Sequence, residues 1–347
     1  MGEKQNPMMN EKILRVGFVG AGDHATQCIY PSLRMAPCKL AAITDLDQAK
    51  AEDAARRFGA GAVYTDYHKM MEKETLDAIF CVGGEKLHME VAMAAMDAGL
   101  HVFIEKPPCE NSGQAEQMLK KSKAAGKHIM VGFMKRFATG FQLAKEVSLR
   151  EEFGGIHQYL AKFTTGRYKK EERFIPHHTI HHFDLARFFL GEITELYTRS
   201  VKIAEGKVGY DISLKSANGA IGTIQMSSLH DWSYPNERVE VTGDERVVIV
   251  DNITDVSYYR PRQRRNFLEQ YKLEDSGDAL HWSPNMTASV LMSHRGYEGE
   301  VAHFVNSILT GTVPMPDIGD GVKTMRLLDA FNQSVKSSSP VTVKGDE

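Results

Sequence analysis

The sequence predicts an α/β protein, with a doubly wound parallel sheet in the first part of the chain and an α+β domain with an open, mostly antiparallel sheet in the second. Three observations predict this class. Short apolar runs alternate with helical patterns up to about residue 135, a glycine-rich turn follows the first run, and strand-like segments dominate beyond residue 136. The 347 residues are sufficient for two domains.

The first domain is predicted over residues 12–135. Its strands are rich in β-branched residues and apolar on both faces, as is typical of parallel strands covered on both sides. They are expected at Ile13–Val19, Leu40–Ile43, Ala78–Val82, Val102–Ile104 and Ile129–Gly132. The helical patterns between them cover His24–Met35, Gln48–Phe58, Leu87–Ala98 and Gln114–Ala125. This alternation predicts right-handed crossovers between parallel strands.

The second domain is predicted over residues 136–347. Strands are expected at Ile156–Thr164, Thr194–Ile203, Tyr210–Ser216, Ala220–Met226, Val239–Thr242 and Val247–Val250, and Asn218-Gly219 is expected to form a two-residue hairpin turn. Helices are expected at Thr139–Leu149, Pro176–Leu190, Gly299–Leu309 and Gly321–Lys336. Pro176 suits a first helical position and Gly191 suits a stop. The last helix is a candidate for packing back on the first domain.

Composition argues against several classes of function. A formal net charge of −3 shows no electrostatic footprint for nucleic acid. No apolar run reaches the roughly 18 residues that a membrane span needs. Residues 1–11 are polar and contain no apolar signal region, so we expect a disordered leader and a cytoplasmic protein. The cysteines Cys28, Cys38, Cys81 and Cys109 have no metal-type spacing and are expected to be reduced and mostly buried.

A glycine-rich turn follows the first predicted strand and reads Gly20-Ala21-Gly22-Asp23-His24-Ala25, in the pattern G-x-G-x-x-A. Gly20 permits a tight turn, Gly22 lets the backbone approach a pyrophosphate, and Ala25 lets helix and strand pack closely. Free N–H groups at the start of the following helix would face the anion. We therefore predict that this turn cradles a dinucleotide in a Rossmann domain, with an ordinary strand–helix turn as the alternative.

Asp45 ends the second strand, where a carboxylate can accept hydrogen bonds from a ribose 2′-hydroxyl. The same charge would repel a 2′-phosphate, and Asp47 adds to that repulsion. The sequence therefore favours NAD over NADP.

Glu105 and Lys106 stand at the carboxyl end of the strand Val102–Ile104, the edge at which open α/β sheets bind ligands. The positive nicotinamide of NAD⁺ would disfavour the ammonium form of a lysine beside it. Lys106 could then accept a hydroxyl proton as hydride leaves the same carbon. A solvated Lys–Glu pair is the alternative for this segment taken alone.

Four histidines fall within the six residues 177–182 of the predicted helix Pro176–Leu190. His177, His181 and Asp184 are spaced i, i+4 and i+7, which places them on one helical face, while His178 and His182 fall on the neighbouring face. His177 and His178 are expected to bind substrate and to be neutral near the helix N-terminus. Metal binding and a packed structural cluster are the alternatives, although spacing supplies no third metal ligand.

Two aromatic residues complete the candidate site. Tyr168 precedes the histidine helix and is expected to overhang the pocket and bind substrate oxygens, with a solvated segment as the alternative. Trp232 follows a strand and would either stack on a sugar face or pack in the core.

Taken in order, these motifs resemble the Gfo/Idh/MocA family of glucose–fructose oxidoreductases and inositol dehydrogenases. The segments that carry the resemblance are the glycine turn, the carboxylate after the second strand, "EKP" at Glu105–Pro107, "VGFMKRF" at Val131–Phe137 and "HHFDLARFFLG" at His181–Gly191. The resemblance covers nearly the whole chain. It implies a Rossmann domain and a second domain, over residues 136–347, that binds substrate and forms a homodimer or homotetramer through its open sheet. It also implies a nicotinamide-dependent reaction on a sugar, cyclitol or related polyol.

The resemblance also implies roles for single residues. Lys106 matches the catalytic lysine, with a cis peptide bond to Pro107, and His181 matches the active-site histidine, which Asp184 would orient or charge-tune. Arg136 and His88 match family positions, and they are expected to bind substrate and cofactor, respectively. The sequence departs from the family in two places. Val82-Gly83-Gly84 replaces a Thr-Pro-Asn-like turn, so backbone groups would contact the cofactor there. His177 replaces an aspartate, which favours a different substrate or a different substrate pose.

The sequence therefore predicts an NAD-dependent dehydrogenase that acts on a secondary alcohol, or its ketone, in a carbohydrate-like molecule. Lys106 would exchange the hydroxyl proton and His181 would bind the substrate or relay that proton. Two alternatives stay open. One is an enzyme that retains and recycles NAD for net isomerisation, epimerisation or redox-assisted glycoside cleavage, and the other is a non-catalytic dinucleotide-binding regulator.

Overall fold

The computed structural model describes residues 12–232, 237–261, 279–284 and 291–345, so the predicted leader lies outside the described residues. The chain forms two compact units. The first contains residues up to 110, 116–132 and 298–319, and the second contains 111–115, 133–297 and the residues from 320 onward. This division differs from the predicted boundary near residue 135 because residues 298–319 return to the first unit. No helix in the described part of the chain has the length and apolar character needed to cross a bilayer.

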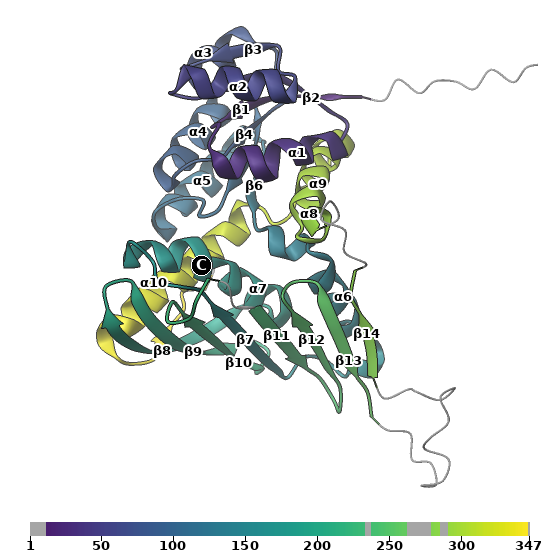
Figure 1. The fold of residues 1–347 in the computed structure, drawn as a ribbon, viewed down its shortest axis with the longest axis vertical. Coiled ribbons are helices and arrows are strands. Elements are labelled where there is room, and N and C mark those ends of the chain that lie inside the picture. Colours follow the sequence, from purple (N-terminus) through teal and green to yellow (C-terminus); the bar gives the residue numbers. More distant parts are fainter. Residues whose placement is uncertain (1–11, 233–236, 262–278, 285–290, 346–347) are drawn as a thin grey trace, which may run out of the picture. The chain divides into compact units, whose positions relative to one another are not determined.

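The first unit is built on a six-stranded, fully parallel sheet, as predicted (Figure 1). Its strands are β1 (Leu14–Val19), β2 (Cys38–Thr44), β3 (Ala62–Tyr64), β4 (Ala78–Cys81), β5 (His101–Glu105) and β6 (Ile129–Gly132). The order β3-β2-β1-β4-β5-β6 makes the sheet doubly wound, with its switch point between β1 and β4. Of these strands, only β3 was not predicted from the sequence. It has three residues, all half-buried.

Helices connect the parallel strands. They include α2 (Gln48–Phe58), α3 (Tyr67–Lys73), α4 (Glu85–Asp97) and α5 (Ser112–Ala125). The single helix predicted over His24–Met35 is instead three short pieces: a π-helical turn at Ala25–Ile29, α1 (Tyr30–Ser32) and a 3₁₀ turn at Leu33–Met35. Pro31 explains much of this break, because a proline inside a helix removes one backbone N–H donor.

A row of phenylalanines crosses one face of this sheet. Phe18 of β1 is paired in register with Phe80 of β4, and Phe80 with Phe103 of β5. The helix α9 (Tyr297–Thr310) covers this row, since the Phe304 ring lies 5.2 Å from that of Phe80 and 5.9 Å from that of Phe103. A helix from near the end of the chain thereby completes the core of the first unit.

The second unit is built on a nine-stranded sheet of order β14-β13-β12-β11-β7-β10-β9-β8-β15. The strands are β7 (Gln158–Thr164), β8 (Ile193–Ala204), β9 (Lys207–Ser216), β10 (Ile221–Ser227), β11 (Glu237–Thr242), β12 (Val247–Asp251), β13 (Asp255–Tyr259), β14 (Ala279–Trp282) and β15 (Val341–Thr342). Neighbouring described strands are antiparallel except for β7 and β10, which confirms a mostly antiparallel sheet. The sequence reading missed β13, β14 and β15.

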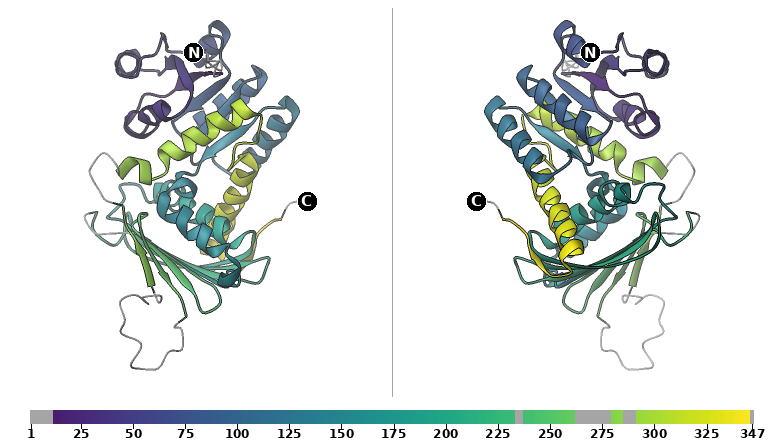
Figure 2. Two further views of the ribbon diagram at one scale, coloured as in Figure 1. Left: turned by 90° about the vertical axis from the view of Figure 1, so that its right-hand side faces the viewer. Right: turned by 90° about the vertical axis from the view of Figure 1, so that its left-hand side faces the viewer.

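The helices α6 (Thr139–Ser148), α7 (Ile180–Leu190) and α10 (Ile318–Ser337) lie on one face of this sheet and leave the other face open (Figure 2). Between β9 and β10 the predicted two-residue turn is wrong. Ser216 N–H donates to Ala220 O at 2.9 Å, so the loop contains the three residues Ala217, Asn218 and Gly219. Gly219 adopts φ +91°, as the αL position of such a loop requires.

A buried ion pair joins three elements of the second unit. The ammonium of Lys135, in the 3₁₀ turn Met134–Phe137, contacts the carboxylate of Glu237 at the start of β11. Nε2 of His182 on α7 lies 3.3 Å from the same carboxylate. Burial alone would raise the pKa of Glu237, but Lys135 and His182 outweigh burial and lower it to about 2. The carboxylate therefore stays charged inside the core.

We expect Glu237→Gln to lower the free energy of unfolding at pH 7 by about 3–5 kcal/mol, because it leaves the buried Lys135 ammonium uncompensated. Glu205→Gln is the control, since Glu205 pairs with Lys202 on the exposed surface, where a pair contributes about 0–1 kcal/mol. Urea unfolding measures both. Because the folded-state pKa is lowered, the contribution of Glu237 is present above its ordinary pKa of 4.5 and is lost as the pH falls towards about 2. Equal destabilisation by the two variants would contradict this account.

Candidate active site

The glycine-rich turn lies at the switch point of the first sheet. Gly20 N–H donates to Thr44 O of β2 at 2.8 Å, and Gly20 adopts φ +103°. A Cβ at this position would lie 2.1 Å from Val82 O, so glycine is needed for both conformation and space. At Gly22, by contrast, a Cβ would meet no atom within 4 Å. The turn thus presents exposed backbone at Gly22, as a phosphate cradle requires, while Ala25 is fully buried against the sheet.

Asp45 lies directly beside this turn. One of its carboxylate oxygens accepts a hydrogen bond from Ala21 N–H at 2.7 Å, and the other accepts one from Asp47 N–H at 2.9 Å. The side chain of Asp47 caps α2. A carboxylate has about four acceptor positions, so two remain on Asp45 for hydroxyl groups.

His88 links the loop after β4 to the segment after β5. Its Nε2 accepts a hydrogen bond from Gly83 N–H at 3.0 Å, so Nδ1 carries the proton and donates to Pro107 O at 2.7 Å. Burial lowers the pKa of His88, which keeps the ring neutral. The exposed glycines Gly83 and Gly84 lie next to Val82, and the Lys106–Pro107 peptide bond is cis, as predicted.

Glu105 connects the same segment to the glycine turn. Oε1 of Glu105 lies 3.1 Å from Nε2 of His24, and Oε2 accepts a hydrogen bond from Lys106 N–H at 3.1 Å. Burial lowers the pKa of His24, but the side chains of Cys28 and Glu105 outweigh it and raise that pKa to about 10. Burial raises the pKa of Glu105, but His24 and Lys106 outweigh it, so the carboxylate is ionised. The first unit therefore brings together all of its predicted site residues.

In the second unit the histidine helix differs from the prediction. Residues Ile175–Thr179 form a π-helical turn, and regular α-helix begins only at Ile180. A π turn has i→i+5 hydrogen bonds in place of the i→i+4 bonds of a regular helix. His177, His178 and His181 are partly exposed, whereas His182 is buried against Glu237. Gly191 ends the helix with φ +80°, as predicted.

Asp184 contacts a different partner from the one expected. Its two oxygens accept hydrogen bonds from Nε and Nη2 of Arg136 at 2.8 and 2.7 Å, and Thr324 lies 3.5 Å away. Arg136 also reaches Asp320 of α10 at 3.2 Å, and Arg187 binds Asp320 at 2.9 Å. The guanidinium of Arg136 is therefore engaged by two carboxylates, and the pairing fixes α7 against α10.

Three predicted substrate-binding side chains gather in an aromatic cluster. The Tyr168 hydroxyl hydrogen-bonds to Nδ1 of His178, and their rings are 5.2 Å apart. The Trp232 ring lies 5.7 Å from that of Tyr168 and is 56% exposed, so it is not a core residue. A Cβ at Gly166 would lie 2.3 Å from the Trp232 ring, so glycine makes room for the indole. Burial raises the pKa of Tyr168 to about 12, which keeps its hydroxyl protonated.

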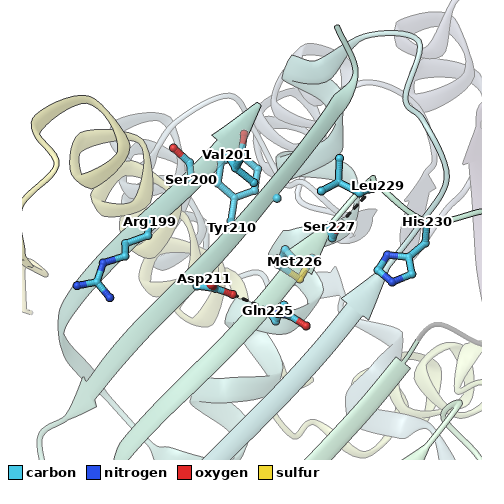
Figure 3. Close-up of a pocket in the computed structure, with 11 residues that line it drawn as sticks. Arg199, Ser200, Val201, Tyr210, Asp211, Gln225, Met226, Ser227, Leu229 and His230 are labelled. Carbon is cyan, nitrogen blue, oxygen red and sulfur yellow. Dashed lines mark hydrogen bonds between the residues drawn. The ribbon is translucent and has the colours of Figure 1, made fainter. Parts of the chain in front are cut away.

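A cavity of about 340 Å³ opens elsewhere in the second unit, at one end of β8, β9 and β10 (Figure 3). Arg199, Asp211, Gln225 and His230 line it together with apolar groups such as Met226. None of the predicted site residues contributes to this lining, so we assign it no part in the chemistry. In the described ranges, no group of three or more His, Cys, Asp or Glu side chains is arranged to hold a metal ion. Of the cysteines, Cys81 and Cys109 are buried, and Cys28 and Cys38 are partly exposed.

Two family models match this chain. One describes an oxidoreductase family with an NAD-binding Rossmann fold and matches residues 14–133, and the other describes the C-terminal alpha/beta domain of that family and matches residues 157–343. The chain belongs to the Gfo/Idh/MocA oxidoreductase family. It is an NAD-binding oxidoreductase with a Rossmann domain, which confirms the resemblance inferred from the motifs.

Individual relatives agree with this assignment. The chain is 23% identical over 355 residues to a myo-inositol 2-dehydrogenase of Thermotoga maritima, covering 95% of this chain and 99% of that protein. It is 27% identical over 350 residues to an inositol 2-dehydrogenase of Rubrobacter xylanophilus, covering 95% and 93%. Among solved structures, a dehydrogenase from Chromobacterium violaceum has the same fold, with a TM-score of 0.85, 20% identity and coverage of 94% and 96%.

The geometry of this Gfo/Idh/MocA chain fits a dinucleotide at the switch point. Exposed backbone at Gly22 would hold the pyrophosphate, the free acceptor positions of Asp45 would hold ribose hydroxyls, and backbone at Val82–Gly84 would lie along the same edge.

The sequence analysis did not predict four buried or partly buried charged residues of the two units: Glu237, Asp320, Arg187 and Glu300. Of these, Glu300 left a signal, because it interrupts the apolar stripe that Val301, Phe304 and Val305 form on one helix.

The two motif glycines should respond differently to alanine. Gly20→Ala places a Cβ against Val82 O at a strained φ, so we expect a clear loss of thermal stability, by about 1–3 kcal/mol or more. Gly22→Ala meets open space in the fold and should unfold like the native protein, but its methyl group would occupy the approach of the pyrophosphate and weaken NADH binding at least tenfold. Thermal unfolding and NADH fluorescence titration measure the two effects. A Gly22→Ala protein with native affinity would contradict the cradle.

Proposed function

We propose that the protein is an NAD-dependent dehydrogenase that interconverts a secondary alcohol and its ketone in a sugar, cyclitol or related polyol. The observation that carries this proposal is the placement of Lys106 at the carboxyl end of β5, joined through Glu105 to the glycine turn that would hold the dinucleotide. The inositol dehydrogenases among its relatives support a cyclitol-like substrate. Bound NAD supplies the hydride acceptor or donor.

Lys106 is assigned the proton exchange with the substrate hydroxyl. Its neighbour Glu105 is already engaged by His24 and by the Lys106 backbone N–H, so this carboxylate does not serve as the base. The amine of Lys106 takes the hydroxyl proton during oxidation and returns it during reduction. His181 binds the same substrate oxygen or relays its proton. The proposal therefore requires Lys106 and His181 to reach the same substrate oxygen.

Substrate positioning is assigned to the aromatic cluster of Tyr168, His178 and Trp232, with His177 beside it. The exposed indole of Trp232 offers an apolar face to the C–H groups of a sugar ring, and the polar edges of the two neighbouring rings offer hydrogen bonds. Arg136 and Asp184 act indirectly, since their mutual pairing holds α7 and thereby His181. This assignment revises the expectation that Arg136 binds substrate.

Asp45 favours NAD over NADP in this proposal. Its carboxylate is held in place by Ala21 N–H and Asp47 N–H, and the exposed carboxylate of Asp47 lies two residues further along the chain. A 2′-phosphate would meet both charges. Oligomerisation is assigned to the open face of the nine-stranded sheet, where exposed apolar residues include Leu160 and Ile221.

A panel of polyols, cyclitols and sugars, followed by NADH or NADPH absorbance, tests the proposal. We expect turnover of at least one compound, with a higher kcat/KM for NAD than for NADP. Absence of turnover with every compound and both cofactors would count against a dehydrogenase, and turnover without added cofactor would instead indicate a recycled NAD.

Lys106→Ala should lower kcat by roughly 10²–10⁴ while the Kd for NADH changes little, because the substitution removes the proton acceptor and leaves the cradle intact. Lys86→Ala provides the control, since Lys86 lies in the first turn of α4 near the same edge of the sheet and its side chain is 79% exposed. Steady-state kinetics and NADH titration give both quantities. Near-native turnover in Lys106→Ala would remove Lys106 from the mechanism.

A further inference from the structure

Glu300 is a buried acid that the proposed chemistry does not use. Glu300 lies on α9 and is fully buried. Both of its carboxyl oxygens lack a hydrogen-bond partner among the described residues. Val301, Phe304 and Val305 of the same helix are also fully buried. A charged carboxylate in such surroundings would be strongly destabilised, because nothing replaces its water.

The register of the core places Glu300 beside the lysine segment. Phe304 packs on Phe103 of β5. Glu300 precedes Phe304 by one helical turn, and Glu105 follows Phe103 by two strand residues, so each acid shares a face with the phenylalanine of its own element. The charges of Glu105 and Lys106, and the thiol of Cys28, act on the Glu300 carboxyl. The two carboxyl groups therefore lie on packed elements of the first unit, and Lys106 follows Glu105 directly in the chain.

Only one of these two acids can be ionised easily. Glu105 is held as an anion by His24 at 3.1 Å and by Lys106 N–H at 3.1 Å. Two neighbouring buried carboxyls do not both ionise, because like charges repel in a medium of low dielectric constant. Burial raises the pKa of Glu300 well above its ordinary value, Glu105 and Cys28 raise it further, and Lys106 opposes them. Glu300 thus retains its proton.

We propose that Glu300 and Glu105 share a single negative charge beside Lys106, and that Glu300 is the member that stays protonated. This inference rests on the proposed role of Lys106. A second carboxylate would stabilise the Lys106 ammonium and reduce the fraction of free amine available as a base. If the charge of Glu105 is removed, Glu300 is no longer repelled and becomes the replacement anion.

Infrared spectroscopy tests the protonation state directly. A protonated carboxyl has a C=O stretch that carboxylates lack. The spectrum of the native protein minus that of Glu300→Gln should show this band at pH 7. The control is the spectrum of the native protein minus that of Glu52→Gln, which removes an exposed glutamate on α2, and it should not show the band. Absence of the band in the first difference spectrum would overturn the proposal. The measurement needs no substrate, so it is independent of whether Lys106 proves to be catalytic.

The pH profile of kcat/KM tests the shared charge. Glu300→Gln alone should leave the acid limb, which reports Lys106, within about 0.3 pH units of native, because one neutral group replaces another. In the Glu105→Gln background Glu300 would ionise, so the double variant should have its acid limb lower than Glu105→Gln by about one pH unit or more. A residue with only a structural role would give no such dependence on Glu105.

Two outcomes of the profiles would contradict the proposal. One is a shift of the acid limb by a full pH unit in Glu300→Gln alone, which would mean that Glu300 is ionised in the native protein. The other is an unchanged limb between Glu105→Gln and the double variant. If Glu105→Gln does not fold, as circular dichroism would show, the infrared measurement alone decides.

Discussion

The ion pair between Glu105 and His24 is the interaction on which the candidate site depends. It joins the carboxyl end of β5 to the turn after β1, across more than eighty residues of sequence, at the point where the strand order of the sheet reverses. The same carboxylate receives the backbone N–H of Lys106. One buried anion therefore fixes both the turn that would hold a dinucleotide and the lysine that would exchange a proton beside it. Its cost in desolvation is offset because both of its oxygens are used.

The second unit applies the same principle to a helix. Two sets of buried charges hold α7: His182 faces the Lys135–Glu237 pair, and Asp184 is held by Arg136, which also binds Asp320. The partly exposed His181 directly precedes these two anchored positions. The histidine segment begins with a π turn, and the segment after the glycine turn does so as well. Such turns are frequent at functional sites, and here both occur at the predicted ones.

Local patterns were sufficient for most of the architecture. Apolar runs and glycine stops predicted five of the six parallel strands of the first unit, because buried parallel strands are continuous apolar segments. The strands that were missed, such as β3 and β15, are too short to show a period. The segment His24–Met35 has a helical pattern, but Pro31 divides it. The π turn before α7 leaves no such trace, so the predicted start of regular helix at Pro176 was wrong.

Tertiary charge pairing could not be predicted in this way. Arg136 and Asp184 are 48 residues apart, and Lys135 and Glu237 are 102 residues apart, so no local spacing records either pair. The family resemblance gave Arg136 and Asp184 as site residues but not their partners. Glu300 is the instructive exception: an acid in an apolar helical stripe is visible in the sequence, and it indicates a buried group that needs a reason.

The claim that matters most is that the Lys106 amine and the His181 imidazole serve one substrate oxygen. A crystal structure of the protein with NAD and a polyol that it oxidises measures this directly. We expect Lys106 Nζ and a ring nitrogen of His181 each within about 2.6–3.2 Å of the oxygen on the reacting carbon, or joined to it through one water. A complex in which the two groups contact different parts of the substrate, or in which either contacts none of it, would contradict the account.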